Sequence, residues 1–462
     1  MFNALTRVTS VAGATDGVVP DTARRRAPRR LLLTTALLAT AAAVGAVVPA
    51  GPAMAADPGQ RARVVLPAPS GPHQVGTVSL HLVDNSRPDP WVPAQPAREL
   101  MVSLRYPAAF PAKDAARYPL APQLAPGVAA AFPDQYLNTN GEPLDQVDWA
   151  ATLTHAHQGA PVDRSGGRLP VVLYSPGAGD PGSLNSTLAD DLASRGYLVV
   201  TVDHTYEAPA VEFPGTPPRV VTGVLGQQFG AVQDDPAEVT ALIQKVMSTR
   251  VADTRFVLDQ VDALAAGRDP DADGQRLPRG LAGSPDPDRI GMFGQSGGGF
   301  TATQAMHDDP RIKAAADLDG VLGLVQNDTD PIDPSTTSTA AADGVDRPML
   351  LMGSQGDDHN TDPSWAALWQ HSTGWHRDVT LTGSTETTFT DKETMLPQIA
   401  RQLKLPSSTL DLGKEIGTIP PERAVAEQRA YLGSFFDRWL RGHNDHLLDG
   451  PSAAYPDAQL VP

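Results

Sequence analysis

The chain has 462 residues, of which 41 are Gly, 44 are Pro and none is Cys, and its formal charge is −17 at pH 7. The lack of cysteine excludes disulfides, thiolate metal sites, iron–sulfur clusters and a cysteine nucleophile. The excess of acidic over basic residues disfavours nucleic acid as a partner, and a hydrophobic fraction of 41% is typical of a globular protein with a sizeable core.

Residues 1–55 have the composition of an export signal. Five arginines at 24–30 precede the apolar run 31–48, and Ala-Met-Ala at 53–55 matches a signal-peptidase site. The arginine pair directly before three leucines is typical of twin-arginine export, with the general export route as the alternative. We therefore expect a secreted, extracellular protein without a stable membrane anchor after cleavage. It would be more acidic than its precursor, because six Arg and two Asp leave with the signal.

The rest of the chain is expected to contain a linker at 56–74, a main domain at 75–450 and a C-terminal tail at 451–462. In the main domain, alternating apolar residues predict two antiparallel strands at 75–107. The Pro- and Ala-rich stretch that follows, to about residue 167, has little periodicity and is interpreted as irregular connections with short helices.

A strand–helix–strand unit comes next. An apolar run at 169–174 ends in a glycine-rich turn, residues 184–195 have a helical pattern, and residues 197–202 form a second buried strand. The segment at about 221–288 interrupts this alternation and contains a predicted helix at 236–266. We interpret the segment as an insertion, either a partial lid or a surface insertion without a gating role.

Strands and helices then alternate to the end of the domain. One strand starts at Arg289, further strands are predicted at 314–318, 348–352 and 378–381, and an amphipathic helix is predicted at 428–441. This order predicts an α/β protein with a doubly wound, mostly parallel sheet, helices on both faces and antiparallel strands leading in.

The motif that carries chemistry is G-Q-S-G-G at 294–298, which lies between a short apolar run and a helix rich in small residues. A G-x-S-x-G sequence in this setting is typical of a nucleophile elbow, a sharp turn that exposes a serine at the carboxyl edge of a sheet. Ser296 is therefore the candidate nucleophile, and the backbone N–H of Gly297 is a candidate oxyanion donor. The alternative is a plain glycine turn.

A second oxyanion donor is expected from the S-P-G-A-G turn at 175–179, which follows an early buried strand. The order of the chain favours the backbone N–H of Ala178, whereas Pro176 has no N–H to donate. The alternative is a tight turn without a catalytic part.

Five blocks of sequence occur in order in the main domain: LPVVLYSPGAG, LADDLASRGYLVVTVDH, RIGMFGQSGGGF, AAADLDG and LTGSTETTFTD. Together they resemble the platelet-activating-factor acetylhydrolase (group VII phospholipase A2) branch of the α/β-hydrolases, especially its secreted bacterial lipase-like members. The resemblance implies an α/β-hydrolase fold and a serine ester hydrolase. It implies Ser296 as nucleophile, Asp319 as the triad acid, and Gly297 and Ala178 as oxyanion donors.

The chain departs from this family at the general base. The family pattern G-S-x-H-x-x-F-x-D corresponds to residues 383–391, where Glu386 stands in place of the histidine. A serine hydroxyl needs an imidazole to take its proton and return it to the leaving group. A solvated glutamate, with a pKa of about 4.3, is a weak base at neutral pH, and Asp319 nearby would repel it.

Three interpretations therefore stay open: an enzyme that uses another histidine, an enzyme with Glu386 as an unusual base, or a catalytically impaired descendant. His359, in a loop after a predicted strand, is the first candidate for a rescue base, and His204, at the end of another strand, is the second. For both, the alternative is a histidine that binds substrate or satisfies the backbone.

The sequence thus predicts a secreted serine esterase or lipase that acts on small or short-acyl carboxylic esters, with a small ester or lipid as substrate. A non-catalytic binding or scaffold protein of the same fold is the alternative. No cofactor or metal is expected, because the calcium-loop-like run 269–274 lacks the glutamate needed at position 280, which is Gly280. The oligomeric state is left open.

Overall fold

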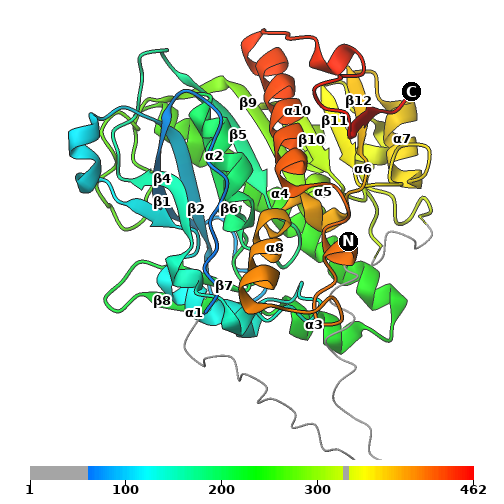
Figure 1. Ribbon diagram of the computed structural model, residues 1–462, viewed down its shortest axis with the longest axis horizontal. Helices are drawn as coiled ribbons and strands as arrows, with labels where there is room; N and C mark the ends of the chain where they lie inside the picture. The colour runs from blue at the N-terminus through cyan, green and yellow to red at the C-terminus, as the bar shows by residue number, and fades with distance from the viewer. Residues whose placement is uncertain (1–60, 326–331) are drawn as a thin grey trace, which may run out of the picture. The chain divides into compact units, whose positions relative to one another are not determined.

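An eleven-stranded sheet organises the part of the chain that the computed structural model describes, residues 61–325 and 332–462 (Figure 1). The predicted export signal lies outside the described residues. In spatial order the strands are β13 (Ala458–Leu460), β12 (His376–Leu381), β11 (Met349–Gly353), β10 (Ile312–Leu318), β9 (Pro285–Gln295), β5 (Leu169–Ser175), β6 (Leu198–Asp203), β2 (Arg98–Ala108), β1 (Gln74–Asp84), β4 (Leu153–Gln158) and β3 (Leu120–Pro122). A separate antiparallel hairpin joins β7 (Ala210–Phe213) to β8 (Arg219–Thr222).

The centre of the sheet is parallel. All neighbours from β12 to β6 run in the same direction. Strands β13 and β2 are antiparallel to their neighbours β12 and β6, and β1 is antiparallel to β2. The two strands predicted at 75–107 are therefore confirmed as the antiparallel pair that leads into a parallel sheet.

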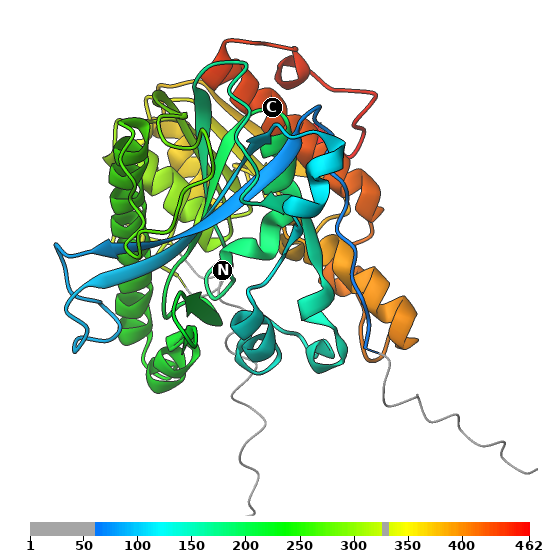
Figure 2. The ribbon, with the colours of Figure 1, turned by 90° about the vertical axis from the view of Figure 1, so that its left-hand side faces the viewer.

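Helices cover both faces of the sheet, as Figure 2 shows with α4 and α10 on opposite sides. The α-helices are α1 (Pro126–Gln135), α2 (Ser186–Ser194), α3 (Leu225–Val232), α4 (Pro236–Ala265), α5 (Gly297–Asp308), α6 (Thr339–Asp343), α7 (Pro363–His371), α8 (Lys392–Leu403), α9 (Leu412–Glu415) and α10 (Pro421–Arg441). Short 3-10 helices are η2 (Ala112–Arg117), η3 (Leu144–Gln146), η4 (Trp149–Ala151), η5 (Gly182–Asn185), η6 (Glu386–Phe389) and η7 (Leu447–Asp449).

Alternate residues of the central strands enter two different cores. In β5, Val171 and Leu173 pack with α4 and α5, whereas Val172 and Tyr174 pack with α2 and α10. A strand covered on both faces must be apolar on both, which explains the continuous apolar runs in the sequence. The predicted doubly wound α/β architecture is confirmed. None of the helices in the described ranges is long and apolar enough to cross a membrane.

Helix α4 lies within the 221–288 segment, which was expected to be an insertion, either a partial lid or a surface insertion. The helix begins with Asp235 as N-cap, whose carboxylate accepts from the amides of Ala237 and Glu238, and with Pro236 in the first turn. Its buried apolar side chains pack in the core that also contains Val171, Leu173 and the apolar residues of α5. This part of the segment therefore supports the sheet, and none of its residues lines the cavity that Ser296 borders.

Other boundaries also differ from the sequence-based expectations. Strand β9 begins at Pro285 rather than Arg289, and α10 begins seven residues before the predicted start, at Pro421. The Pro- and Ala-rich stretch contains α1, β3 and β4, and its residues form a third core with α8. Ala62 in the predicted linker is 1% exposed and belongs to this third core, so the folded region starts earlier than expected.

Candidate active site

Ser296 lies in a sharp turn between β9 and α5. Its backbone is in the left-handed region, with φ 54° and ψ −123°, and its N–H donates to the carbonyl of Leu318 at 2.8 Å. A Cβ on Gly294 would collide with the backbone of Gly298, and a Cβ on Gly298 would collide with the carbonyl of Ser175. Both glycines of the motif are therefore needed for close backbone approach, as the elbow interpretation predicts.

The two predicted oxyanion donors come together beside the elbow. A Cβ built on Gly297 would lie 3.3 Å from the backbone nitrogen of Ala178, although the two residues are far apart in the sequence. The carbonyl of Ala178 accepts from Asn138 Nδ2 at 2.9 Å. The backbones of residues 178 and 297 are therefore neighbours, as a pair of oxyanion donors would require.

Ser296 borders a cavity of about 230 Å³. Most of the lining is polar, and it includes two lysines and three carboxylates. The lining residues are Tyr136, Asn138, Asn140, Gly177, Ala178, Asp180, Gln295, Ser296, Thr385, Glu386, Thr387, Thr390, Lys392, Lys414 and Glu415.

Asp319 follows β10, the strand next to β9. It has a positive φ of 58°, and its Oδ1 accepts from the backbone N–H of Ser354 at 2.5 Å. A Cβ on the following residue, Gly320, would collide with the carbonyl of Ser296, so the two turns are in contact. The structure therefore brings Asp319 to the same sheet edge as the elbow, although it is not among the residues that line the cavity.

Glu386 lines the same cavity as Ser296. It is the first residue of η6, which is fixed by a capping box between Thr385 and Thr388. Gln295, the residue before the candidate nucleophile, donates from Nε2 to Glu386 Oε1 at 3.4 Å. A carboxylate is therefore present at the position where the family pattern requires an imidazole.

His359 has other partners. Its Nδ1 and its backbone N–H both lie 2.7 Å from Asp378 Oδ2, and its ring stacks on Trp369 with centroids 3.9 Å apart. It is not among the residues that line the cavity. These contacts give no support to the predicted rescue role and favour the alternative, a histidine that satisfies its local environment.

His204 is also engaged away from the cavity. Its Nε2 lies 3.0 Å from Ser175 Oγ and its Nδ1 lies 2.9 Å from Asp253 Oδ2. The ring is 1% exposed. Sequence reasoning noted Ser175 only as the start of the S-P-G-A-G turn. It did not select Asp253, because a charged residue in a helical pattern is ordinarily placed on the solvent face.

Asp180 is a second feature that sequence reasoning missed. It lines the cavity and accepts from Tyr136 Oη at 2.9 Å and from Asn138 Nδ2 at 2.7 Å. Burial raises the pKa of Asp180. Its position directly after the S-P-G-A-G turn was the available signal, but Tyr136 and Asn138 lie in the stretch that has little periodicity.

Candidate metal ligands do not gather around this cavity or elsewhere in residues 61–325 and 332–462, where no group of three or more His, Asp and Glu could hold a metal ion. In the calcium-loop-like segment, Asp271 Oδ1 accepts from the backbone N–H of His81 at 2.9 Å, and Asp273 Oδ2 lies 2.9 Å from His81 Nδ1. The two carboxylates therefore attach the loop to β1 through their contacts with His81.

Known esterases are similar to this chain in sequence and in fold. The family described as platelet-activating factor acetylhydrolase, isoform II, matches residues 59–407. A protein of Arthroderma benhamiae described as a probable 1-alkyl-2-acetylglycerophosphocholine esterase is 28% identical over 409 residues, covering 86% of this chain and 94% of that protein. The solved structure of a ferulic acid esterase from Streptomyces cinnamoneus matches with a TM-score of 0.65 and 33% identity, covering 86% of this chain and 99% of that one.

Proposed function

Because the chain belongs to the platelet-activating factor acetylhydrolase, isoform II, family, we propose that it is a serine carboxylic-ester hydrolase that acts through an acyl-enzyme on Ser296. The observation that carries the proposal is the left-handed turn at Ser296 with the backbone of Gly297 next to the amide of Ala178. This arrangement supports a nucleophile with two oxyanion donors at one edge of a cavity.

The proposed reaction has two steps. Ser296 Oγ attacks the ester carbonyl, and the negative charge on the carbonyl oxygen is stabilised by the N–H groups of Gly297 and Ala178. The alcohol leaves, and water then hydrolyses the acyl-serine. Asp319 would orient or stabilise the group that takes the serine proton.

The substrate is proposed to be a small or short-acyl ester, which includes lipids with a short acyl group. The modest volume of the cavity, about 230 Å³, and the many polar residues among those that line it support this class. The two relatives are described as a probable 1-alkyl-2-acetylglycerophosphocholine esterase and a ferulic acid esterase, which supports an ester as the substrate. We also propose that the protein is exported and acts outside the cell, on the basis of its N-terminal sequence.

Glu386 supports a second candidate function. A carboxylate in place of the imidazole leaves Ser296 without the usual proton acceptor. The alternative is therefore a catalytically impaired member of the family that binds an ester-like ligand in the same cavity or acts as a scaffold. Active and impaired forms share every other feature of the site, so turnover itself must decide between them.

The test is hydrolysis of 4-nitrophenyl acetate and butyrate by the wild-type protein and by Ser296→Ala. We expect measurable wild-type turnover and a loss of at least about 1,000-fold in kcat in Ser296→Ala, because the nucleophile is removed. Ser284→Ala is the matched control: Ser284 is equally buried but precedes the opposite end of β9. Turnover retained in Ser296→Ala would refute the nucleophile assignment, and a wild-type protein without turnover would favour the impaired alternative.

A further inference from the structure

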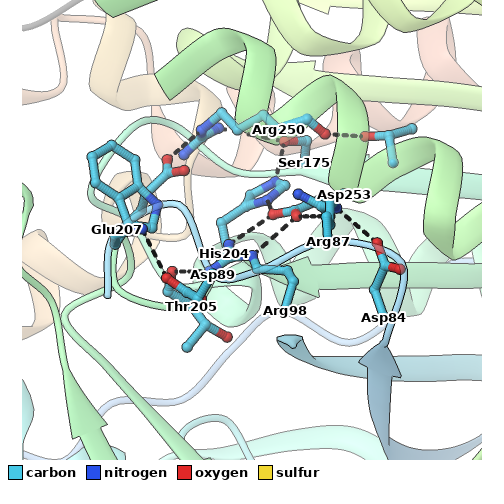
Figure 3. A network of polar contacts seen from close by, with 12 residues as sticks. Asp84, Arg87, Asp89, Arg98, Ser175, His204, Thr205, Glu207, Arg250 and Asp253 are labelled. Carbon is cyan, nitrogen blue, oxygen red and sulfur yellow. Dashed lines mark hydrogen bonds and ion pairs between the residues drawn. The ribbon is translucent and has the colours of Figure 1, made fainter. Parts of the chain in front are cut away.

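The molecule buries a Ser–His–Asp set that is separate from the residues lining the candidate active site (Figure 3). Ser175 Oγ lies 3.0 Å from His204 Nε2, and His204 Nδ1 lies 2.9 Å from Asp253 Oδ2. The three residues come from the end of β5, the end of β6 and the middle of α4. Their exposed fractions are 0%, 1% and 0%.

The protonation of this set follows from its partners. Asp253 also accepts from Arg98 Nη2 at 2.8 Å and Arg87 Nη2 at 2.6 Å. Burial alone would raise the pKa of Asp253, but Arg98 and the hydrogen bond from His204 hold it below its usual range, so it stays ionised. Burial, with the nearby charge of Arg250, lowers the pKa of His204. The neutral ring then donates from Nδ1 to Asp253 and accepts from the Ser175 hydroxyl at Nε2.

This arrangement cannot act as a second catalytic triad. None of the three residues lines the cavity, and Ser175 has no exposed surface for a substrate to reach. Ser175 is, however, the first residue of the S-P-G-A-G turn that carries Ala178. The hydrogen bonds of the buried set therefore fix the start of the turn that holds a proposed oxyanion donor.

Arg250 holds the next two residues of that turn. From α4, its Nη1 donates to the carbonyl of Pro176 at 2.6 Å and its Nη2 donates to the carbonyl of Gly177 at 3.0 Å. Its Nε donates to Glu207 Oε2 at 2.7 Å, which balances the buried charge. The guanidinium is planar and carries donors in a fixed fork, so it holds two neighbouring carbonyls in one defined orientation.

The hydrogen bonds to the Gly177 carbonyl, one from Arg250 and one from the backbone N–H of Asp180 at 3.1 Å, fix the direction of the Ala178 N–H. The carbonyl of Gly177 and the N–H of Ala178 belong to the same planar trans peptide, in which the two groups point in opposite directions. Since Arg250 holds the carbonyl on the α4 side, the N–H must point away from Arg250. The nitrogen of Ala178 lies 3.3 Å from the position that a Cβ on Gly297 would occupy, so it is next to the first residue after Ser296.

We propose that Arg250 is a positioning residue for the oxyanion hole: it holds the peptide between residues 177 and 178 so that the Ala178 N–H points at the reacting carbonyl oxygen. The inference rests on the proposed hydrolase function. It extends that function by making a buried arginine on α4, outside the cavity, responsible for the direction of a catalytic hydrogen bond.

The test uses kinetics together with a measurement that does not depend on turnover. In Arg250→Lys, which keeps the positive charge beside Glu207 but loses the fork, we expect kcat to fall about 10- to 100-fold, because losing one oxyanion donor outright costs about 100- to 1,000-fold. KM should change less than about threefold, because the donor acts mainly in the transition state. Hydrogen–deuterium exchange at residues 176–180 should become faster.

Arg255→Gln is the matched control, since Arg255 is on the same helix and its side chain is 58% exposed. It should leave kcat and the exchange of residues 176–180 unchanged. The double variant Arg250→Gln with Glu207→Gln removes both buried charges and covers the case in which Arg250→Lys does not fold. An unchanged kcat, or equal losses in kcat and affinity, in a folded Arg250 variant would overturn the proposal. If the wild-type protein has no turnover, the hydrolase proposal fails first, and unchanged exchange in the Arg250 variants would still refute the positioning role.

Discussion

Glu386 is the residue on which the chemistry of this protein depends most. In the proposed assignment the elbow, the two amides and Asp319 take the roles that the resemblance implies, and only the proton acceptor differs. Its carboxylate lies in the cavity, next to Gln295 and at the start of η6. A histidine at the same position would lie on the same backbone and would face the same cavity.

We predict that Glu386→His raises kcat for 4-nitrophenyl acetate by about 100-fold or more, because general-base catalysis contributes about 100- to 10,000-fold. Glu386→Gln is the matched control, since it removes the carboxylate without adding a base, and it should change kcat by only a few-fold. A large loss in Glu386→Gln would instead identify Glu386 as an unusual base. No gain in Glu386→His would mean that another residue takes the serine proton.

Helix α8 shows how a buried carboxylate can make one element sensitive to pH. Glu393, in its first turn, has no exposed surface. Burial raises the pKa of Glu393 to about 8 from an ordinary value of 4.5. The folded state therefore keeps a proton that the unfolded chain releases, and the associated stability is lost as the pH rises from about 4.5 through about 8.

We predict that Glu393→Gln makes the free energy of unfolding less dependent on pH. Between pH 5 and pH 8 the wild-type protein should lose at least about 1.4 kcal/mol more than the variant, which corresponds to one pKa unit. Urea unfolding at the two pH values measures this difference. Glu238→Gln, an exposed glutamate in the first turn of α4, should keep the wild-type slope; equal slopes in all three proteins would contradict the prediction.

The helices and strands show what the sequence could and could not predict. Apolar alternation and continuous apolar runs were sufficient for β1, β2, β5 and β6, because burial determines both patterns. The stretch from 108 to 167 contains α1, β3 and β4 but has little periodicity, because its residues pack irregularly in the third core. In the candidate site, the elbow could be predicted because the G-x-S-x-G motif at 294–298 is local in the sequence.

The sequence could not predict the buried polar network around Arg250 and Asp253, because the network depends on contacts between elements that are distant in the chain. The helical period of α4 sets the positions of Arg250 and Asp253. Their buried hydrogen-bond partners come from β2 and from the ends of β5 and β6, which the helical period does not predict. A helix pattern assigns charged residues to the solvent face by default. The exception arises where other charges and backbone carbonyls are already buried.

At the scale of the whole molecule, residues 61–66, the first that the structure describes, are part of the folded unit. The backbone N–H of Val65 donates to Gln398 Oε1 at 3.0 Å, and Gln398 Nε2 donates back to the Val65 carbonyl at 2.9 Å. Val64 and Leu66 are each 3% exposed and pack in the third core with α8. These residues therefore lie along α8 and pack against its apolar side chains.

We predict that a chain starting at residue 68 is less stable than a chain starting at residue 56 by about 3–6 kcal/mol, since burying one Val or Leu contributes about 1.5–3 kcal/mol. Urea unfolding of the two chains measures the difference, with the double variant Val64→Ala and Leu66→Ala in the longer chain as an intermediate case. Equal unfolding midpoints would show that residues 61–66 add nothing to stability.

The two outermost strands of the eleven-stranded sheet have a consequence for behaviour at high concentration. Strands β13 and β3 contain only three residues each, and β3 ends in Pro122. A short edge offers few free N–H and C=O groups to the edge of another molecule, and proline offers no N–H at all. Concentrated solutions of the folded protein should therefore resist edge-to-edge aggregation, even though the sheet is wide and no disulfide protects it.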